Sequence, residues 1–234
     1  MTGTTDARLI DLWEIAAKEH PIDRALTLIA AHDPSADRAA LAQLPIDQRD
    51  ARLFGLAVSL VGPHLRVIAT CDACGGQTNL DVAIADILAQ VPSDQARSKV
   101  FAHDGQDYAF RLPNSLDLAR ALKAEDATVA RRALLTALIE TPNAAPDLLD
   151  AFEAHLADNA GIEALTLGHK CAECEAEQAA EVDIVDILWR QVSARAQRLL
   201  WDVHLLAQSY GWSSSEILSL SPTRRAAHVA MVSG

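Results

Sequence analysis

The amino-acid sequence predicts an α+β protein that is mainly α-helical, with two small β elements that meet at a metal. Three observations predict this class. Ala and Leu dominate while aromatic residues are only 4% of the chain, a balance that favours helix over strand. Apolar residues recur at helical spacing through much of the 234 residues. Two CxxC pairs each lie between short strand-like segments.

The N-terminal part of the chain has a helical pattern. Pro21 interrupts an amphipathic stretch, and Gly62 followed by Pro63 is a helix-stop signal. The segment LRVIAT that comes next is strand-like. The expected elements are two short helices within 6–32, a partly helical connection at 33–45, a helix from near Pro45 to about Val61, and a strand at 65–70.

A β-hairpin and three helices are expected between the cysteine pairs. Asp104-Gly105 is a favoured tight-turn dipeptide, so strands are predicted at 100–103 and 108–111. Ser115 is predicted to cap a helix over 116–123. Further helices are predicted at 126–140 and 146–157, the first with an inner face formed by Val129, Ala130, Ala133, Leu134, Ala137 and Leu138.

The C-terminal part is predicted to be a long helix over about 186–209 and two short ones. Gly211 ends the long helix, Ser213 and Glu216 form a capping-box pattern, and Pro222 opens the last helix. The chain therefore divides into an N-terminal helical segment (1–45), a duplicated zinc-knuckle core with an inserted hairpin and helices (46–185), and a C-terminal helical segment (186–234).

An internal repeat organises the core. CDACGGQTNLDVAIADIL begins at residue 71 and CAECEAEQAAEVDIVDIL at residue 171, with 7 identities in 18 positions without gaps. A helix and a strand-like segment precede each copy, at 65–70 and 162–170, and a strand that turns into a helix follows each pair. Duplication explains this recurrence better than coincidence does.

The four cysteines predict one structural zinc ion held by Cys71, Cys74, Cys171 and Cys174. A CxxC turn points two thiols the same way, and two facing turns form a tetrahedral site. The 96 residues between the pairs far exceed the spacing in a compact zinc ribbon, so the site is split between the two copies of the repeat. Metal binding would then stabilise the fold of the whole core.

Other interpretations of the cysteines remain open at this point. They are a redox CxxC, unmetallated thiols, a disulfide formed on oxidation, and replacement of one ligand by His169. The second pair is followed by Glu175-Ala176 where the first has Gly75-Gly76, which makes its turn less certain. A catalytic zinc is disfavoured because four thiolates leave no coordination position for water.

Charge and missing motifs exclude several functions. The net charge of −12 opposes binding to nucleic acid or anionic lipid, and no apolar run is long enough to span a membrane. The N-terminus lacks the pattern of a secretory signal, so a cytoplasmic protein is expected. No dinucleotide, phosphate-loop, hydrolase or zincin motif occurs, so we predict no catalytic or cofactor-binding residues beyond the zinc ligands.

Three stretches carry a resemblance to a known family. They are FRLPNSLDLARAL at 110–122, CAEC followed by DIVDILW, and WDVHLLAQSYGWSSSEILSLSPTRRAAHVAMV at 201–232. Together they resemble the baseplate-associated and baseplate hub assembly proteins of contractile phage tails and phage-tail-like contractile injection systems. The resemblance covers about residues 65–232, and its C-terminal signature is the specific part. The second knuckle departs from the family pattern because it lacks the Pro and the Gly.

The resemblance implies a non-enzymatic baseplate component or baseplate assembly factor (chaperone), stabilised by structural zinc. Its partners would be other baseplate, hub or tail proteins, and it would be cytoplasmic or incorporated into a phage-tail-like particle. The alternative interpretation is a zinc-ribbon regulatory protein that binds nucleic acid, which the acidic residues beside the cysteines oppose. An enzyme of unrecognised type is the third hypothesis, and a pocket with paired titratable groups would support it.

Overall fold

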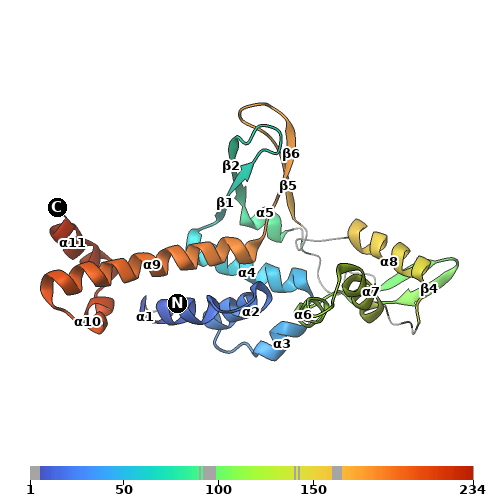
Figure 1. Ribbon diagram of the computed structural model, residues 1–234, viewed down its shortest axis with the longest axis horizontal. Coiled ribbons are helices and arrows are strands. Elements are labelled where there is room, and N and C mark those ends of the chain that lie inside the picture. The colour runs from blue at the N-terminus through green and yellow to red at the C-terminus, as the bar shows by residue number, and fades with distance from the viewer. Residues whose placement is uncertain are drawn as a thin grey trace. The chain divides into compact units, whose positions relative to one another are not determined.

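The computed structural model describes residues 6–89, 91, 99–139, 141, 143–159 and 165–233. Its helices are α1 Asp6–Ala16, α2 Pro21–His32, α3 Arg38–Gln43, α4 Ile46–Val61, α5 Ile84–Leu88, α6 Ser115–Ala121, α7 Ala127–Leu138, α8 Pro146–Asp158, α9 Ile184–Tyr210, α10 Ser214–Ser219 and α11 Pro222–Ser233 (Figure 1). Its strands are β1 His64–Thr70, β2 Gln77–Ala83, β3 Val100–His103, β4 Gln106–Ala109, β5 Thr166–Lys170 and β6 Glu177–Glu181. The predicted α+β class with a majority of helix is confirmed.

The chain forms two compact units. Residues up to His32 and from Val185 onward make the first unit, and Asp33–Ile184 makes the second. The division into 1–45, 46–185 and 186–234 stays a prediction about sequence segments. No helix in the described part of the chain is both long enough and apolar enough to cross a lipid bilayer.

In the first unit, α9 supplies a continuous apolar stripe. The buried positions of α9 in this unit are Val185, Ile187, Leu188, Val192, Ala196, Leu199 and Leu206, and the partly buried Val203 lies between the last two. Most of them recur every three to four residues, which places them on one face of the helix. Gly211 ends α9 with a φ of 69°, and the capping box of Ser213 and Glu216 begins α10, as predicted. The Trp212 ring stacks on Tyr210 with a centroid distance of 4.7 Å.

A buried ion-pair cluster ties three helices of the first unit together. Arg225 on α11 contacts Asp6 on α1 through Nη2 at 2.6 Å and Asp202 on α9 through Nε at 3.1 Å. Arg195 reaches the other oxygen of Asp6 at 3.4 Å. The side chains of Arg225 and Asp6 are only 6% and 8% exposed, so each depends on the other for solvation.

The described residues of the second unit form three separate antiparallel hairpins. The hairpin predicted at Asp104-Gly105 is confirmed, and both turn residues have positive φ, at 48° and 76°. Its second strand was expected at 108–111 but lies at β4, Gln106–Ala109, because the two-residue turn returns the chain to the ladder at once. Phe110 then leaves that ladder and bridges to Ile139.

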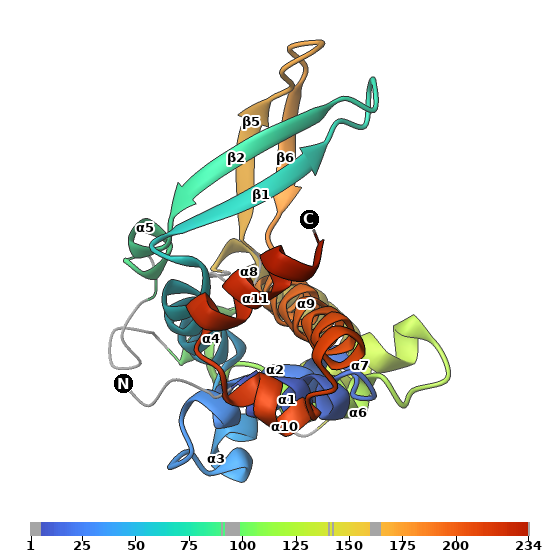
Figure 2. The same cartoon turned by 90° about the vertical axis from the view of Figure 1, so that its left-hand side faces the viewer.

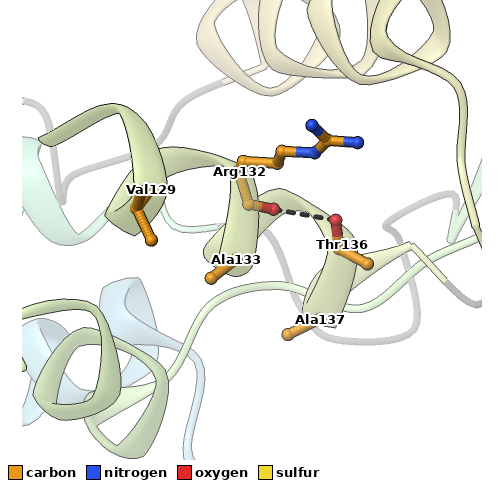
Figure 3. A pocket seen from close by; sticks show the side chains of 5 residues that line it. All are labelled: Val129, Arg132, Ala133, Thr136 and Ala137. Atoms are coloured by element: carbon orange, nitrogen blue, oxygen red, sulfur yellow. Dashed lines mark hydrogen bonds between the residues drawn. The ribbon is translucent and has the colours of Figure 1, made fainter. Parts of the chain in front are cut away.

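The core beside this hairpin corrects the predicted inner face of α7. Phe101, Phe110 and Phe152 pack with Leu135 and Leu138 of α7 in an apolar cluster. Val129, Ala133 and Ala137 were expected to be inside but line an open hollow with Arg132 and Thr136 (Figure 3). The large leucines determine which face is buried, because exposing alanine costs little apolar area.

The start of α6 also differs from the prediction. Its N-cap is Asn114 rather than Ser115, and Asn114 forms a capping box with Asp117. Ser115 is instead buried in the first turn, where its hydroxyl accepts a 3.3 Å hydrogen bond from Arg49. The carboxylate of Asp117 also accepts hydrogen bonds from Nη1 and Nη2 of Arg111, at 2.5 and 2.8 Å. This buried carboxylate therefore links the residues that follow the hairpin to α6.

The other predicted elements agree with the structure within a few residues. Pro21 begins α2, Gly62 ends α4 with a φ of 96°, and Pro222 begins α11. The predicted strand at 162–170 begins outside the described residues, which contain β5 from Thr166. The predicted helix at 126–140 ends at Leu138, where Ile139 turns to extended backbone, and residue 140 lies outside the described residues.

Candidate metal centre

Two hairpins of the second unit present the four predicted ligands. The β1–β2 hairpin carries Cys71 and Cys74 at its tip, and the β5–β6 hairpin carries Cys171 and Cys174. The two hairpins project next to each other from the helices in Figure 1, and Figure 2 shows that the β1–β2 hairpin crosses the β5–β6 hairpin. The last paired residues are equivalent in the two copies, Thr70 with Gln77 and Lys170 with Glu177, so each CxxC turn leaves its ladder at the same register.

Both tips form the same kind of turn. The N–H of Cys71 donates to the carbonyl of Gly76 at 2.9 Å, and the N–H of Gly75 donates to the carbonyl of Cys71 at 2.9 Å. In the second copy Cys171 pairs with Ala176 at 3.0 Å and Glu175 with Cys171 at 3.1 Å. These closures hold both thiols of a pair on one side of the turn.

Backbone N–H groups also point at the sulfurs. Gly76 donates to Sγ of Cys74 at 3.3 Å, and Glu173 donates to Sγ of Cys171 at 3.4 Å. Such donors stabilise a thiolate more than a thiol, because the acceptor then carries full negative charge. The turns are therefore suited to the ionised form that binds metals.

The four sulfurs converge. Sγ of Cys71 lies 3.7 Å from that of Cys174, and Sγ of Cys74 lies 3.6 Å from that of Cys171. All four atoms lie within 4.8 Å of one another. A tetrahedron with Zn–S bonds of about 2.3 Å has sulfurs about 3.8 Å apart. The separations across the two hairpins therefore match a shared tetrahedral ion, and the site could bind a metal of that kind.

The pKa values of two of the crowded thiols shift in opposite directions. Backbone donation by Cys174 and Glu173 lowers the pKa of Cys171 to about 6. At Cys74 the N–H of Gly76 lowers the pKa, but neighbouring thiols, Cys174 first, together with burial raise it to about 12. Thiolates held this close together repel one another, so the fully ionised set needs a compensating positive charge. A divalent cation provides that charge.

Cross-hairpin hydrogen bonds repeat the symmetry of the sulfurs. The N–H of Asp72 donates to Oε1 of Gln178 at 3.3 Å, and the N–H of Ala172 donates to Oγ1 of Thr78 at 3.1 Å. The two donors are equivalent in the repeat, and so are the two acceptors. The copies therefore face each other as two-fold partners, which the sequence repeat did not reveal by itself.

The second turn forms without the glycine pair of the first. Glu175 takes a φ of 59°, close to the 75° of its counterpart Gly75. A non-glycine residue in this left-handed region costs roughly 1–2 kcal/mol, so other interactions of the turn offset that cost. A Cβ at Gly76 would lie 2.7 Å from the carboxyl group of the exposed Glu173, which can move aside, and the counterpart of Gly76 in the second copy is Ala176.

His169 lies outside the ligand group. It was considered as a substitute ligand, but the metal-binding cluster found among the described residues contains only the four cysteines. Nδ1 of His169 lies 3.3 Å from the carbonyl oxygen of Leu167. All four thiols are free, and the two short sulfur contacts join opposite hairpins rather than the members of one CxxC pair.

The chemistry of the centre is that of a closed site. Four thiolates occupy every position of a tetrahedral ion, leaving no place for a reacting water. The ion would link two hairpins that are far apart in the sequence. Comparison of the chain with protein-family models, with curated proteins and with solved structures finds no match.

Proposed function

We propose that this protein is a non-enzymatic baseplate component or baseplate assembly factor of a contractile phage-tail-like injection system, stabilised by one structural zinc ion. The zinc ion is proposed because the four cysteine sulfurs, which come from two copies of one repeat, all lie within 4.8 Å of one another. The three sequence stretches that resemble the baseplate family support the assembly role. The two parts have separate tests.

The metal is proposed as structural because each half of the site is weak alone. A two-stranded hairpin is marginally stable in water, and each knuckle belongs to such a hairpin. An ion bound by both knuckles joins them, and its binding free energy then contributes to folding. Zinc suits four thiolates in a tetrahedral arrangement better than a hard cation such as magnesium or calcium does.

Residues of the resembling stretches have scaffolding contacts that suit a protein built for assembly. Arg111 and Asp117 of the first stretch join a hairpin exit to α6. Trp212 and Arg225 of the last stretch help order the C-terminal helices of the first unit. Side chains fixed in this way make the scaffold rigid, which suits a protein that holds partners in place.

Metal content and stability test the first part. The freshly purified chain should contain one zinc per molecule, with four sulfur neighbours at about 2.3 Å by X-ray absorption. Cys71→Ser should abolish metal retention and lower the melting temperature of the second unit, whereas Ala73→Ser in the same turn should change neither. A metal-free wild-type protein, or a melting temperature that a chelator leaves unchanged, contradicts the structural zinc.

Reconstitution tests the second part. The chain should co-purify with at least one purified baseplate, hub, tube or sheath protein of a contractile particle when mixed pairwise. A gel shift at low salt distinguishes the nucleic-acid alternative, for which the exposed acids Asp72, Glu173, Glu175 and Glu177 predict no binding. Failure to bind any tail protein, with the zinc site intact, would refute the baseplate role alone.

A further inference from the structure

A groove of about 400 Å³ lies between the two hairpins of the metal centre. Its walls are residues 67–70 of β1 and 178–181 of β6, with Asp72 and His169 near the knuckles. Successive side chains of a strand point to opposite faces of the sheet, so a groove lined by one face would be lined by every second residue. The two consecutive runs indicate that the strand edges, with their backbone groups, line the groove.

Those edges have no strand beside them in the described part of the chain. β1 is hydrogen-bonded to β2 alone and β6 to β5 alone. β1 runs toward the knuckle and β6 runs away from it, so the two edges point in opposite directions. The two hairpins cross in Figure 2, so an added strand would pair along one of these edges, and both antiparallel and parallel pairings are stable arrangements.

The side chains of the groove define what such a strand must carry. Asp72 is exposed at the knuckle end and Glu181 is exposed at the opposite end of β6, while the lining contains no Lys or Arg. Between them lie the small Ala179 and Ala180 and the apolar Ile68, which is 63% exposed. Nε2 of His169 is buried and has no hydrogen-bond partner. The groove is acidic at its ends and has room beside its middle.

We propose that this groove binds an extended segment of another protein, with Lys or Arg toward each end and small or β-branched residues between. Free strand edges add such a segment by backbone hydrogen bonding, and flanking side chains provide the selectivity. Gln178, whose side chain accepts a hydrogen bond from the N–H of Asp72, lies three residue steps, or about 10 Å, from Glu181, so the two basic residues should be about three positions apart. The inference rests on the proposed role in protein assembly and adds the chemistry of a partner to it.

Selection from a displayed library of random 12-residue peptides, using the full-length metal-loaded chain, tests the groove. Enriched peptides should carry two basic residues about three positions apart around small or β-branched residues. For a representative synthetic peptide, Glu181→Lys should weaken binding at least tenfold. Glu125→Lys changes the net charge equally at an exposed position outside the groove, and it should weaken binding less than twofold.

A charge exchange makes the test specific. A peptide with Glu in place of its basic residues should bind Glu181→Lys more tightly than it binds the wild type. The proposal is overturned if selection yields no such basic peptides, if Glu125→Lys weakens binding as much as Glu181→Lys, or if light scattering shows that a second copy occupies the groove. If the zinc-loaded wild-type chain binds no such peptide but still binds a tail protein, this inference is refuted while the metal and assembly proposals stand.

Discussion

Replacing Arg225 with alanine should destabilise the first unit by about 3 kcal/mol, because it leaves the carboxylate of Asp6 buried without its closest partner. Asp6 is 8% exposed in its side chain, and the remaining contact, to Arg195, is 3.4 Å long. Breaking a buried ion pair generally costs about 3–5 kcal/mol. The lower end applies here, because Arg195 stays near Asp6 and Asp202, at 26% exposed, can be hydrated.

Tryptophan fluorescence follows this change selectively. All four tryptophans of the chain, Trp13, Trp189, Trp201 and Trp212, belong to the first unit. Urea unfolding monitored at the tryptophan emission therefore reports that unit. For a unit of roughly 80 residues, 3 kcal/mol corresponds to a fall of about 12–24 °C in melting temperature.

Arg224 provides the matched control. It precedes Arg225 on α11 but is exposed, so Arg224→Ala should change stability by less than about 0.5 kcal/mol. Asp202→Asn keeps the shape of the cluster and should fall between the two arginine variants. If Arg225→Ala and Arg224→Ala unfold at the same urea concentration, the cluster does not stabilise the unit and the reasoning from burial fails.

Three further predictions concern the second unit. Asp117→Asn should lower stability at neutral pH by about 2 kcal/mol. Burial raises the pKa of Asp117, but the hydrogen bonds from Arg111 and the neighbouring charges outweigh burial and lower that pKa. The stability that the ionised Asp117 gives the wild type is therefore present above the ordinary carboxyl pKa and is lost as the pH falls through the lowered pKa. Between pH 7 and pH 3 the urea midpoint of the variant should fall less than that of the wild type. Glu175→Gly should stabilise the metal-loaded protein by about 0.5–1 kcal/mol, whereas Gly75→Ala should destabilise it by about 1 kcal/mol, and equal effects of the same sign in thermal melts would contradict the strain argument. Arg131→Ala should leave the urea unfolding midpoint nearly unchanged in spite of its two acidic partners, because its side chain is 41% exposed; a clear fall in that midpoint would contradict the expected solvent screening.

The features that the sequence predicted well were those with local signals. The duplicated cysteine turns, the Asp104-Gly105 hairpin and the capping box at Ser213 each depend on a few adjacent residues with strict conformational preferences. Even the convergence of the two knuckles could be expected, since a CxxC pair supplies only half of a tetrahedral site.

The features that the sequence did not predict depend on neighbours distant in the chain. On the alanine-rich α7 two stripes look equally apolar, and only the phenylalanine cluster of the folded unit determines that Leu135 is buried. Asn114 and Ser115 are both good caps, and the buried Arg49 engages the serine. The groove between β1 and β6 had no sequence signal, because it depends on where two hairpins stop pairing.

The long separation between the two knuckles has a consequence during translation. At about 5–20 residues per second, the ribosome needs roughly 5 to 20 seconds to make the 96 residues between Cys74 and Cys171. Throughout that interval the nascent chain carries two thiols with no intramolecular partners to complete the site. The four-cysteine site can form only after residue 174 has left the ribosome. A polypeptide released before that point keeps only Cys71 and Cys74, which are half of the ligand set.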